Sequence, residues 1–342
     1  MKMSARVGSK PLRIGFVGAG MISLYHLRAW AEVAGARVVA ICDPNEEARR
    51  GRSAEFKIPA TYRDLETMLA HERLDAVDIA TPVRTHADLV RIAADEGVHV
   101  MCQKPLAPTV AEAAALVAYV GERVRFMVHE NYRFRRHYAV TREWIIDGRI
   151  GRPRQARLVM RCSGMCAVGE GKPWLLARQP YLGEMPRLLV FETLIHHLDT
   201  LRSLLGELRV ESCILSKVNS DLAGEDTAVV TLRGDGDLIA ILDGTFSAPG
   251  YSSNLSDRLE IMGEKATLSY SGERLSLVGE EGRGIRFPSD PNGEDQECFN
   301  ASIRNFVNGL VTGTPFATDR LDNLKTLKLM ESCYDRAHRT FE

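Results

Sequence analysis

Short apolar runs alternate with segments of helical periodicity over the first 130 residues. The apolar runs occupy residues 12–17, 37–42, 75–80, 98–102 and 125–128, and the helix-like segments occupy residues 21–31, 45–55, 86–95 and 110–120. Thr85-x-x-Asp88 and Thr109-x-x-Glu112 have the spacing of capping boxes at two helix starts. This alternation predicts a parallel sheet covered on both faces, which binds ligands beyond the carboxyl ends of its strands.

The pattern changes after residue 131. Strand-like runs occupy residues 155–162, 210–216, 227–232, 238–246, 259–262 and 266–269, and helices are predicted at 137–147, 191–205, 298–311 and 320–337. Short turns such as Gly234-Asp235-Gly236 predict a large, mostly antiparallel open sheet with helices on one face. Residues 238–242 are apolar at every position, so we expect a second copy of the chain to cover the other face, in a homodimer or homotetramer.

Length and composition narrow the class of protein. The 342 residues suffice for two domains, and 44 Lys and Arg against 45 Asp and Glu leave a formal charge of −1, which does not predict nucleic-acid binding. No apolar run approaches the 18 residues of a membrane span, and the short run near the N-terminus is typical of a strand rather than a signal peptide. Seven scattered cysteines are typical of the cytoplasm.

The first apolar run leads directly into Gly18-Ala19-Gly20-Met21-Ile22-Ser23 and a helix. This is the dinucleotide fingerprint with Ser at its third glycine position, although alone it also fits a plain strand–helix turn. The second apolar run ends at Asp43, 25 residues beyond Gly18, where an acid receives ribose hydroxyls. Its carboxylate would repel a 2′-phosphate, so the predicted cofactor is NAD rather than NADP.

Two further segments follow strands at the same predicted edge. Thr81, Pro82 and His86 follow the third strand, and Gln103 and Lys104 follow the fourth. We expect them to contact the cofactor together with Gly18, Gly20, Met21, Ile22 and Asp43. Lys104 is also a candidate to hydrogen-bond a substrate hydroxyl or to transfer its proton, although most loop lysines are simply solvated.

The helix at 191–205 carries a second group of candidates. Leucines form one stripe, and Glu192, His196, Asp199 and Ser203 form another about 200° around the helix. A histidine between carboxylates is suited to proton exchange, but an ordinary solvated face fits the pattern equally well.

Arg133 lies in a basic run after Asn131 and is a candidate to hold an anionic substrate group, with Asn131 and Asp199 as further substrate contacts. Pairing with nearby acids or solvation is the more common fate of such a run. Cys162-x-x-x-Cys166 and His196-His197 lack a second close thiol pair, so no metal is expected.

Together these segments resemble the Gfo/Idh/MocA family of NAD(P)-dependent oxidoreductases, which includes glucose–fructose oxidoreductase and inositol dehydrogenase. The resemblance rests on GAGMIS-x-x-His26, on Thr81-Pro82 with His86, and on the segments HVMCQKPL (99–106), DGRIGRP (147–153) and IHHLDTLRSLLGE (195–207). It implies an α/β fold class with an N-terminal Rossmann dinucleotide-binding domain (1–130). A C-terminal α+β domain (131–342) would bind substrate and form oligomers through its sheet.

The resemblance also implies roles for Lys104, Glu192 and His196 in catalysis. Three departures bear on substrate placement: Gln103 stands where the family usually has Glu, Glu192 where it has Asp, and Met185–Leu189 where it has a glycine run. The expected reaction is reversible oxidation of a secondary alcohol of a sugar, polyol or related carbohydrate. A non-catalytic redox-sensing regulator and an NAD-dependent glycosidase-type enzyme remain the alternatives.

Overall fold

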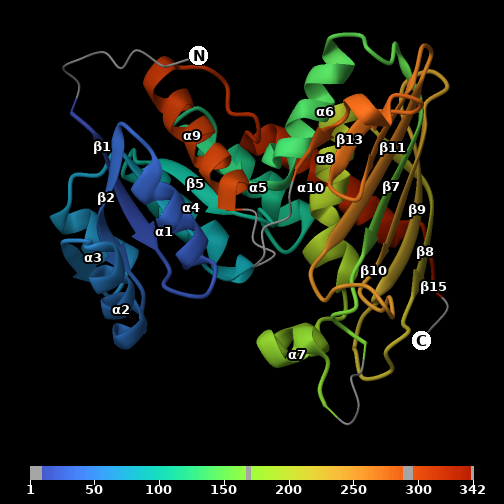
Figure 1. Cartoon of the computed structure of the whole chain (residues 1–342). Coiled ribbons are helices and arrows are strands. Elements are labelled where there is room, and N and C mark those ends of the chain that lie inside the picture. The colour runs from blue at the N-terminus through green and yellow to red at the C-terminus, as the bar shows by residue number, and fades with distance from the viewer. Residues whose placement is uncertain (1–9, 167–170, 288–295, 340–342) are drawn as a thin grey trace. The chain divides into compact units, whose positions relative to one another are not determined.

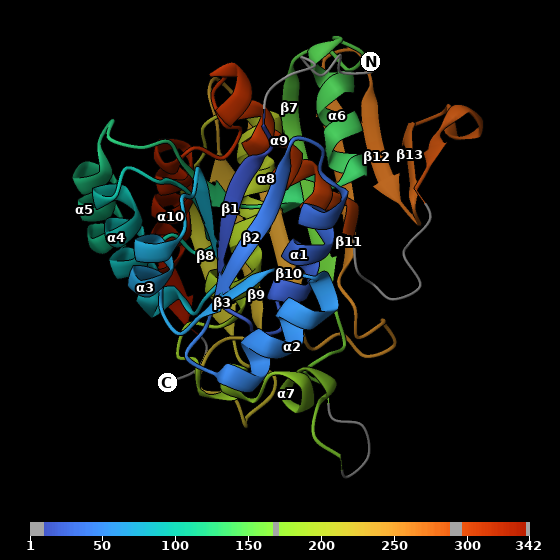
Figure 2. The ribbon, with the colours of Figure 1, turned by 90° about the vertical axis from the view of Figure 1, so that its left-hand side faces the viewer.

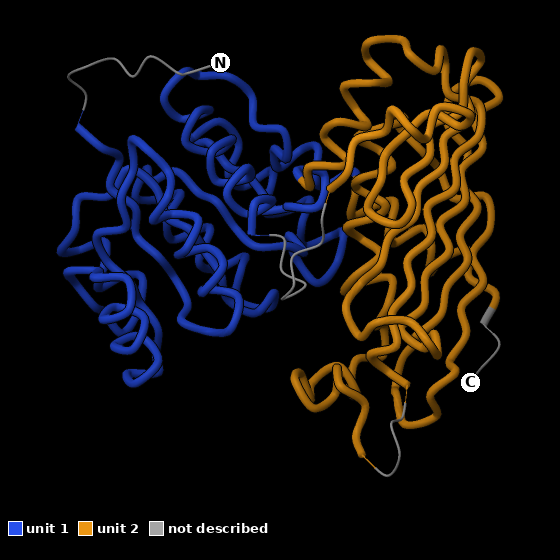
Figure 3. The backbone as a smooth tube through the Cα atoms, in the orientation of Figure 1, with its two compact units in different colours: residues 1–134, 296–325 blue, residues 135–295, 326–342 orange. Residues whose placement is uncertain are grey.

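The computed structural model describes residues 10–166, 171–287 and 296–339. The chain divides into two compact units: unit 1 comprises residues 1–134 and 296–325, and unit 2 comprises residues 135–295 and 326–342 (Figure 3).

Unit 1 is built on a six-stranded sheet with the order β3-β2-β1-β4-β5-β6, in which every pair is parallel (Figure 1). Its strands are β1 (Leu12–Val17), β2 (Ala36–Cys42), β3 (Ala60–Tyr62), β4 (Ala76–Ile79), β5 (His99–Gln103) and β6 (Phe126–His129). The chain leaves β1 toward β2 and β3, and then returns to the other side of β1 with β4. Sheets of this kind bind ligands at the carboxyl ends of the strands beside that switch point.

Helices cover both faces of this sheet. They are α1 (Ser23–Glu32), α2 (Glu46–Phe56), α3 (Leu65–His71), η1 (Val83–Thr85), α4 (His86–Asp95), α5 (Val110–Val120), η2 (Tyr132–Phe134) and α9 (Gln296–Thr312). Gly15 of β1 faces α3, since a Cβ there would lie 2.8 Å from Met68. In Figure 2, α1 and α2 lie on one side of β1–β3, and α3, α4 and α5 lie on the other.

The return of α9 to unit 1 is the main difference from the predicted division at residue 130. Ile303 and Phe306 of α9 join Trp30 of α1 and Phe16 of β1 in one buried apolar cluster. Since α9 buries its apolar face there, residues 296–325 belong to unit 1 rather than to a continuous second domain. The predictions also lacked β3 and α3, which are only three and seven residues long.

One of the two predicted capping boxes is present. The Thr109 side chain accepts a hydrogen bond from the Glu112 N–H, and Glu112 accepts in return. The box predicted at Thr85 and Asp88 is wrong, because the Thr85 hydroxyl instead donates to Thr81 Oγ1 and the Pro82 carbonyl.

Unit 2 contains a nine-stranded sheet with the order β14-β13-β12-β11-β7-β10-β9-β8-β15, in which only the β10–β7 and β15–β8 pairs are parallel. Its strands are β7 (Pro153–Arg161), β8 (Arg209–Ser216), β9 (Thr227–Arg233), β10 (Ile239–Thr245), β11 (Ser256–Gly263), β12 (Thr267–Ser271), β13 (Arg274–Leu277), β14 (Ile285–Arg286) and β15 (Ala337–Arg339). The predicted mostly antiparallel sheet is therefore confirmed.

Helical segments cover one face of this sheet. They include α6 (Arg136–Ile146), the π-helical segment η4 (Leu189–Leu194), α8 (Ile195–Leu205) and α10 (Arg320–Asp335). Unit 2 also contains α7 (Trp174–Arg178), η3 (Pro180–Glu184) and a short 3-10 turn, η5 (Glu281–Arg283), which follows β13. Leu194 packs directly on Gly244 of β10, where a Cβ would lie 2.7 Å from the leucine side chain. Glycine thus lets η4 approach the strand closely.

A buried carboxylate joins α6, α8 and β11. Asp257 accepts a hydrogen bond from the Tyr138 hydroxyl (2.8 Å), lies 3.0 Å from His197 Nε2 and pairs with Arg135 (3.3 Å). Burial alone would raise the pKa of Asp257, but the charge and hydrogen bond of His197, with Arg135, hold that pKa below its usual range. These hydrogen bonds and the Arg135 ion pair therefore hold both helices on the sheet.

None of the helices in the described ranges is long and apolar enough to span a bilayer.

His137 makes unit 2 sensitive to acid. Its ring stacks on Tyr270 at 4.2 Å, and burial, with the nearby charge of Arg135, lowers the pKa of His137 to about 3. The unfolded chain takes up this proton near pH 6.5. The contribution of His137 to the free energy of unfolding is therefore fully present above that pH. It is lost as the pH drops toward 3, by up to about 1.4 kcal/mol per pH unit.

We expect His137→Phe to flatten the pH dependence of the free energy of unfolding between pH 6.5 and 4, because the stack remains and the proton uptake is lost. Denaturant titrations at several pH values measure this slope. His71→Phe, at an exposed histidine, is the matched control and should leave it unchanged. An equal slope in His137→Phe and the wild type would contradict the assignment.

Candidate active site

The turn after β1 depends on one glycine. Gly18 has a φ of +104°, and its N–H donates to the Cys42 carbonyl at 2.8 Å. A Cβ at Gly18 would lie 2.5 Å from the Ala80 carbonyl oxygen of the segment that follows β4, whereas a Cβ at Gly20 would meet no atom within 4 Å. Gly18 is therefore required by the fold of unit 1, and Gly20 leaves open space beside the helix start, as a cradle for a pyrophosphate requires.

Ser23, at the third glycine position, is built into this turn. Its side chain is fully buried, donates to the Gly20 carbonyl at 2.6 Å and accepts from Arg52 Nε at 3.0 Å. The serine thereby connects the turn to α2 and occupies its position without exposing a polar group. Met21 and Ile22 lie in the same turn, with the Met21 side chain 47% exposed.

Asp43 lies at the carboxyl end of β2, next to the glycine turn. One of its carboxylate oxygens accepts from the Ala19 N–H and the other from the Asn45 N–H, both at 2.7 Å. These bonds fix the carboxylate in the position at which a dinucleotide fold receives ribose hydroxyls.

The loop after β4 and the loop after β5 are joined by a buried histidine. The His86 ring nitrogens lie 2.8 Å from the Thr81 carbonyl and 2.9 Å from the Pro105 carbonyl, and the ring is fully buried. Burial lowers the pKa of His86, with a smaller opposing contribution from these hydrogen bonds. The neutral ring has one N–H and donates to one of the two carbonyls, while it lies buried between the two loops that carry Thr81, Pro82 and Lys104.

Lys104 follows β5 at the same edge of the sheet and is half-buried. Its backbone N–H donates to Gln103 Oε1 at 2.7 Å. The Gln103 amide nitrogen lies 3.1 Å from His26 Nε2 in the interior. Unit 1 thus brings Gly18, Asp43, Thr81 and Lys104 to the carboxyl ends of neighbouring strands, as predicted for a ligand edge.

In unit 2, the π-helical segment η4 carries Glu192 and leads into α8, which carries His196. π-Helical turns are frequent at functional sites. Glu192 is half-buried, whereas His196 is 8% exposed and Asp199 is fully buried. The interpretation of this helix stripe as a solvated face is therefore wrong.

A buried acid holds η4 in place. Glu225 accepts from the Leu188 N–H (3.3 Å), from the Val190 N–H (3.1 Å) and from the Tyr334 hydroxyl (2.6 Å). Burial and the charge of Glu225 raise the pKa of Tyr334, so the phenol stays protonated and donates. The geometry of Glu192 therefore depends on a carboxylate 33 residues further along the chain.

Asp199 joins α8 to α10 in this structure. Its Oδ1 accepts from the Thr326 hydroxyl at 2.7 Å, and Thr326 in turn accepts from Arg202 at 2.6 Å. Because the carboxylate is enclosed within this chain of bonds, the geometry offers no support for the substrate contact predicted for Asp199.

The predicted substrate contacts of unit 1 also have internal partners. Arg133 pairs with Asp322 at 2.8 Å and donates to the Ala317 carbonyl at 2.6 Å. The Asn131 amide donates to Cys298 Sγ at 3.1 Å. Arg133 therefore pairs with a nearby acid, which is the alternative to a role in holding an anionic substrate group.

Sequence reasoning missed Tyr181 in η3. Its side chain is 52% exposed, and its hydroxyl donates to Gln179 at 2.8 Å. Partial burial and the charge of Glu192 raise the pKa of Tyr181, which places the phenol within electrostatic reach of that carboxylate. Aromatic residues in an irregular, Gly- and Pro-rich segment give little sequence signal.

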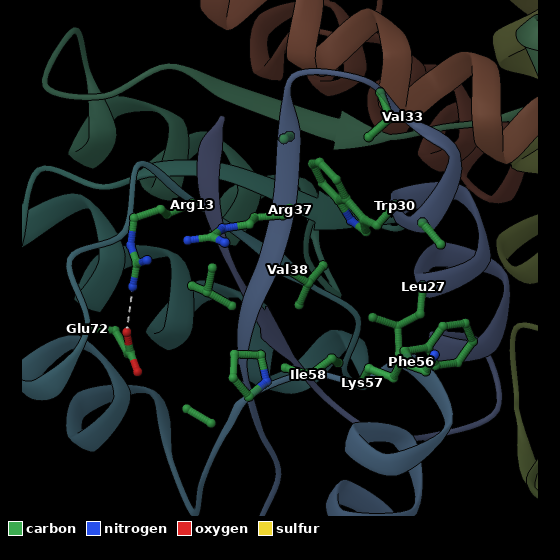
Figure 4. A pocket seen from close by; sticks show the side chains of 15 residues that line it. Arg13, Leu27, Trp30, Val33, Arg37, Val38, Phe56, Lys57, Ile58 and Glu72 are labelled. Carbon is green, nitrogen blue, oxygen red and sulfur yellow. Dashed lines mark hydrogen bonds and ion pairs between the residues drawn. The ribbon is translucent and has the colours of Figure 1, made fainter. Parts of the chain in front are cut away.

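A cavity of about 680 Å³ lies at the opposite end of the strands of unit 1 (Figure 4). Arg13, Arg37 and Val38 near the starts of β1 and β2 line it, with Phe56 at the end of α2. Arg13 is paired there with Glu72 at 2.7 Å. Since it opens at the amino ends of the strands, this cavity is not the candidate cofactor site.

Within the described ranges, His, Cys, Asp and Glu side chains form no group of three or more that could hold a metal ion.

A parallel sheet with a positive-φ glycine turn and a carboxylate at the end of β2 defines a dinucleotide-binding fold, and Lys104 lies at the same sheet edge after β5. Residues 12–131 match an oxidoreductase family described by its NAD-binding Rossmann fold, and residues 138–269 match the GFO/IDH/MocA C-terminal domain. The chain belongs to the Gfo/Idh/MocA family of NAD-dependent oxidoreductases. The predicted family, fold class, cofactor and dehydrogenase activity are thereby confirmed.

Similar proteins span nearly the whole chain. D-apiose dehydrogenase from Paraburkholderia graminis is 34% identical over 336 residues, which cover 95% of this chain and 87% of that protein. Inositol 2-dehydrogenase from Rhizobium meliloti is 27% identical, with 94% and 95% covered. The crystal structure of an oxidoreductase from Agrobacterium radiobacter with NAD+, L-tartaric acid and magnesium has a TM-score of 0.87 at 29% identity, covering 96% of both chains.

Substitution of the two glycines of the turn should have different effects, one on stability and the other on NADH affinity. Gly18→Ala should lower the free energy of unfolding by roughly 2 kcal/mol or more, because the positive φ is strained and the Ala80 carbonyl lies in the way. Gly20→Ala should leave stability unchanged and weaken NADH binding roughly tenfold or more, about 1.4 kcal/mol. Denaturant unfolding and NADH titration measure both. Equal stability of the two variants would contradict this division of roles.

Proposed function

We propose that the enzyme reversibly oxidises a secondary alcohol of a sugar, polyol or related carbohydrate, with Lys104 and His196 serving the reacting oxygen. The observation that carries the proposal is the position of Lys104 at the carboxyl end of β5, on the sheet edge that carries the Gly18 turn. Bound NAD supplies the hydride acceptor. Gly20 would accommodate its pyrophosphate and Asp43 its adenosine ribose.

The protein's share of the chemistry is proton transfer and orientation. In this proposal, His196 takes the proton of the alcohol hydroxyl as the hydride leaves the carbon that bears that hydroxyl. Lys104 hydrogen-bonds the hydroxyl oxygen and stabilises its developing negative charge. Glu192 orients the substrate or His196. Lys104 belongs to unit 1 and His196 to unit 2, so their convergence on one substrate is part of the proposal.

Residues with internal partners act indirectly. His86 serves the cofactor site by lying buried between the Thr81 and Lys104 loops, where its ring nitrogens face carbonyls. Asp199 serves His196 by anchoring α8 through Thr326. We also retain the prediction of a cytoplasmic enzyme, which rests on the number and scatter of the seven cysteines; none of them forms a disulfide in the described residues, and all but Cys166 are buried.

The relatives narrow the substrates to test. Two proteins named D-apiose dehydrogenase are 34% and 30% identical over 95% of this chain, and inositol dehydrogenases follow at lower identity. D-Apiose is therefore the first substrate to assay, followed by myo-inositol. The Agrobacterium structure holds L-tartaric acid, a compound with secondary alcohols beside carboxylates, so sugar acids complete the panel.

Lys104→Ala should lower kcat by about 10²- to 10⁴-fold, the usual contribution of a group that transfers or stabilises a proton, and His196→Asn should do the same. NADH affinity should change little in either variant. Net NADH formation and NADH titration measure the two quantities, and Lys10→Ala, at an exposed lysine of unit 1, is the control.

Wild-type turnover in Lys104→Ala would refute the assignment. Substrate turnover without net NADH would point to a glycosidase-type cycle that returns its cofactor oxidised, and NADH binding without turnover of any substrate would point to a regulator.

We further propose a homo-oligomer formed through the uncovered face of the unit 2 sheet. Ile214, Val229, Ile239 and Met262 have side chains 37–49% exposed on β8, β9, β10 and β11. Val229 pairs with Ile214 in register. Exposed apolar side chains on neighbouring strands of one sheet face are typical of a face that packs against another surface.

Ile214→Glu combined with Ile239→Glu should lower the oligomeric state in sedimentation experiments at micromolar concentration, because charges would be buried in the contact. Ile146→Glu, on α6 and 66% exposed, is the control and should leave assembly intact. A monomeric wild type would refute the proposal.

A further inference from the structure

A chain of hydrogen-bonded side chains leads from the interior of unit 1 to the backbone of Lys104. Asp78 Oδ2 accepts from Trp30 Nε1 at 2.7 Å and lies 2.8 Å from His26 Nδ1. His26 Nε2 lies 3.1 Å from Gln103 Nε2, and Gln103 Oε1 accepts from the Lys104 N–H at 2.7 Å. Asp78 and His26 are fully buried. The chain therefore connects the centre of the sheet to the backbone of the candidate catalytic lysine.

Hydrogen-bond chemistry allows one arrangement of this chain. The Lys104 N–H is a donor, so the Gln103 atom that faces it must be the amide oxygen. The amide nitrogen of Gln103 therefore faces His26. An amide nitrogen only donates, so His26 Nε2 must present its lone pair. The imidazole proton then lies on Nδ1 and is donated to Asp78, which makes His26 a neutral ring with a fixed tautomer.

The packing around His26 agrees with a neutral ring. Its centroid lies 4.1 Å from that of His129, 5.6 Å from that of Phe299 and 6.1 Å from that of Phe16. A charge on His26 would have to be removed from water among these rings, which costs free energy.

We infer that Gln103 is a positioning residue, which holds the Lys104 backbone to a buried Asp78–His26 pair and requires His26 to be neutral. The inference rests on the proposed function of Lys104. A carboxylate at position 103 would still accept from the Lys104 N–H, but it would also require a proton on His26 Nε2. The residue at 103 therefore decides whether the His26 ring is neutral or charged.

The tautomer gives a readout that is independent of turnover. ¹⁵N shifts of labelled histidine, with His26 assigned through His26→Asn, should show Nδ1 protonated and Nε2 unprotonated in the wild type at pH 7. Gln103→Glu should show both nitrogens protonated. A wild-type His26 that carries its proton on Nε2, or a Gln103→Glu variant with an unchanged spectrum, would overturn the inference.

Kinetics test the positioning itself. Gln103→Met removes both hydrogen bonds and should lower kcat by about 10- to 100-fold through misplacement of Lys104, with NADH affinity within threefold of the wild type. Gln103→Glu keeps the bond to the Lys104 N–H and should recover most of that loss. Trp30→Phe, which removes a donor to Asp78 without breaking the chain, is the control for core stability and should retain kcat.

The failures are distinguishable. Wild-type kcat in Gln103→Met, where Lys104→Ala is inactive, would overturn the positioning role and leave the proposed function standing. Turnover in Lys104→Ala would instead defeat the proposed function, while the histidine spectra would still report on the chain.

Discussion

The close approach of the β1 turn to the strands beside it is the constraint on which unit 1 depends. Gly18 bonds to the end of β2 and lies against the carbonyl that follows β4. No side chain fits there, so the first turn of α1 begins at the sheet edge. Because β2, β4 and β5 run parallel to β1, their carboxyl ends lie at the same edge of the sheet. Asp43, Thr81 and Lys104 therefore lie along one edge although they are far apart in the sequence.

Three buried carboxylates organise the residues behind the candidate chemistry. Asp78 leads through His26 and Gln103 to Lys104, Glu225 holds the π-helical segment that carries Glu192, and Asp257 holds His197 next to His196. A buried charge is costly unless it is paired and hydrogen-bonded. Each of these acids accepts from at least two donors outside its own element, so each fixes its element against the elements that carry the donors.

The local interpretations from which the structure departs share one cause. The Thr85 capping box, the solvated face considered for α8 and the continuous second domain were all interpreted from neighbouring residues alone. Thr85 found partners in the preceding loop, α8 was enclosed on both stripes, and α9 buried its apolar face against α1. In each case the outcome depended on a tertiary contact with residues that the local pattern does not include.

The sequence by itself determined the order of elements, the glycine turn, the acid after β2 and the lysine after β5, because these depend on periodicity and on backbone requirements within a few residues. The tertiary structure alone decided which acids are buried, which arginines are paired and how Gln103 is oriented. Those features depend on partners from distant strands and helices, and the free energy of a buried polar group is set by such partners rather than by its neighbours in the chain.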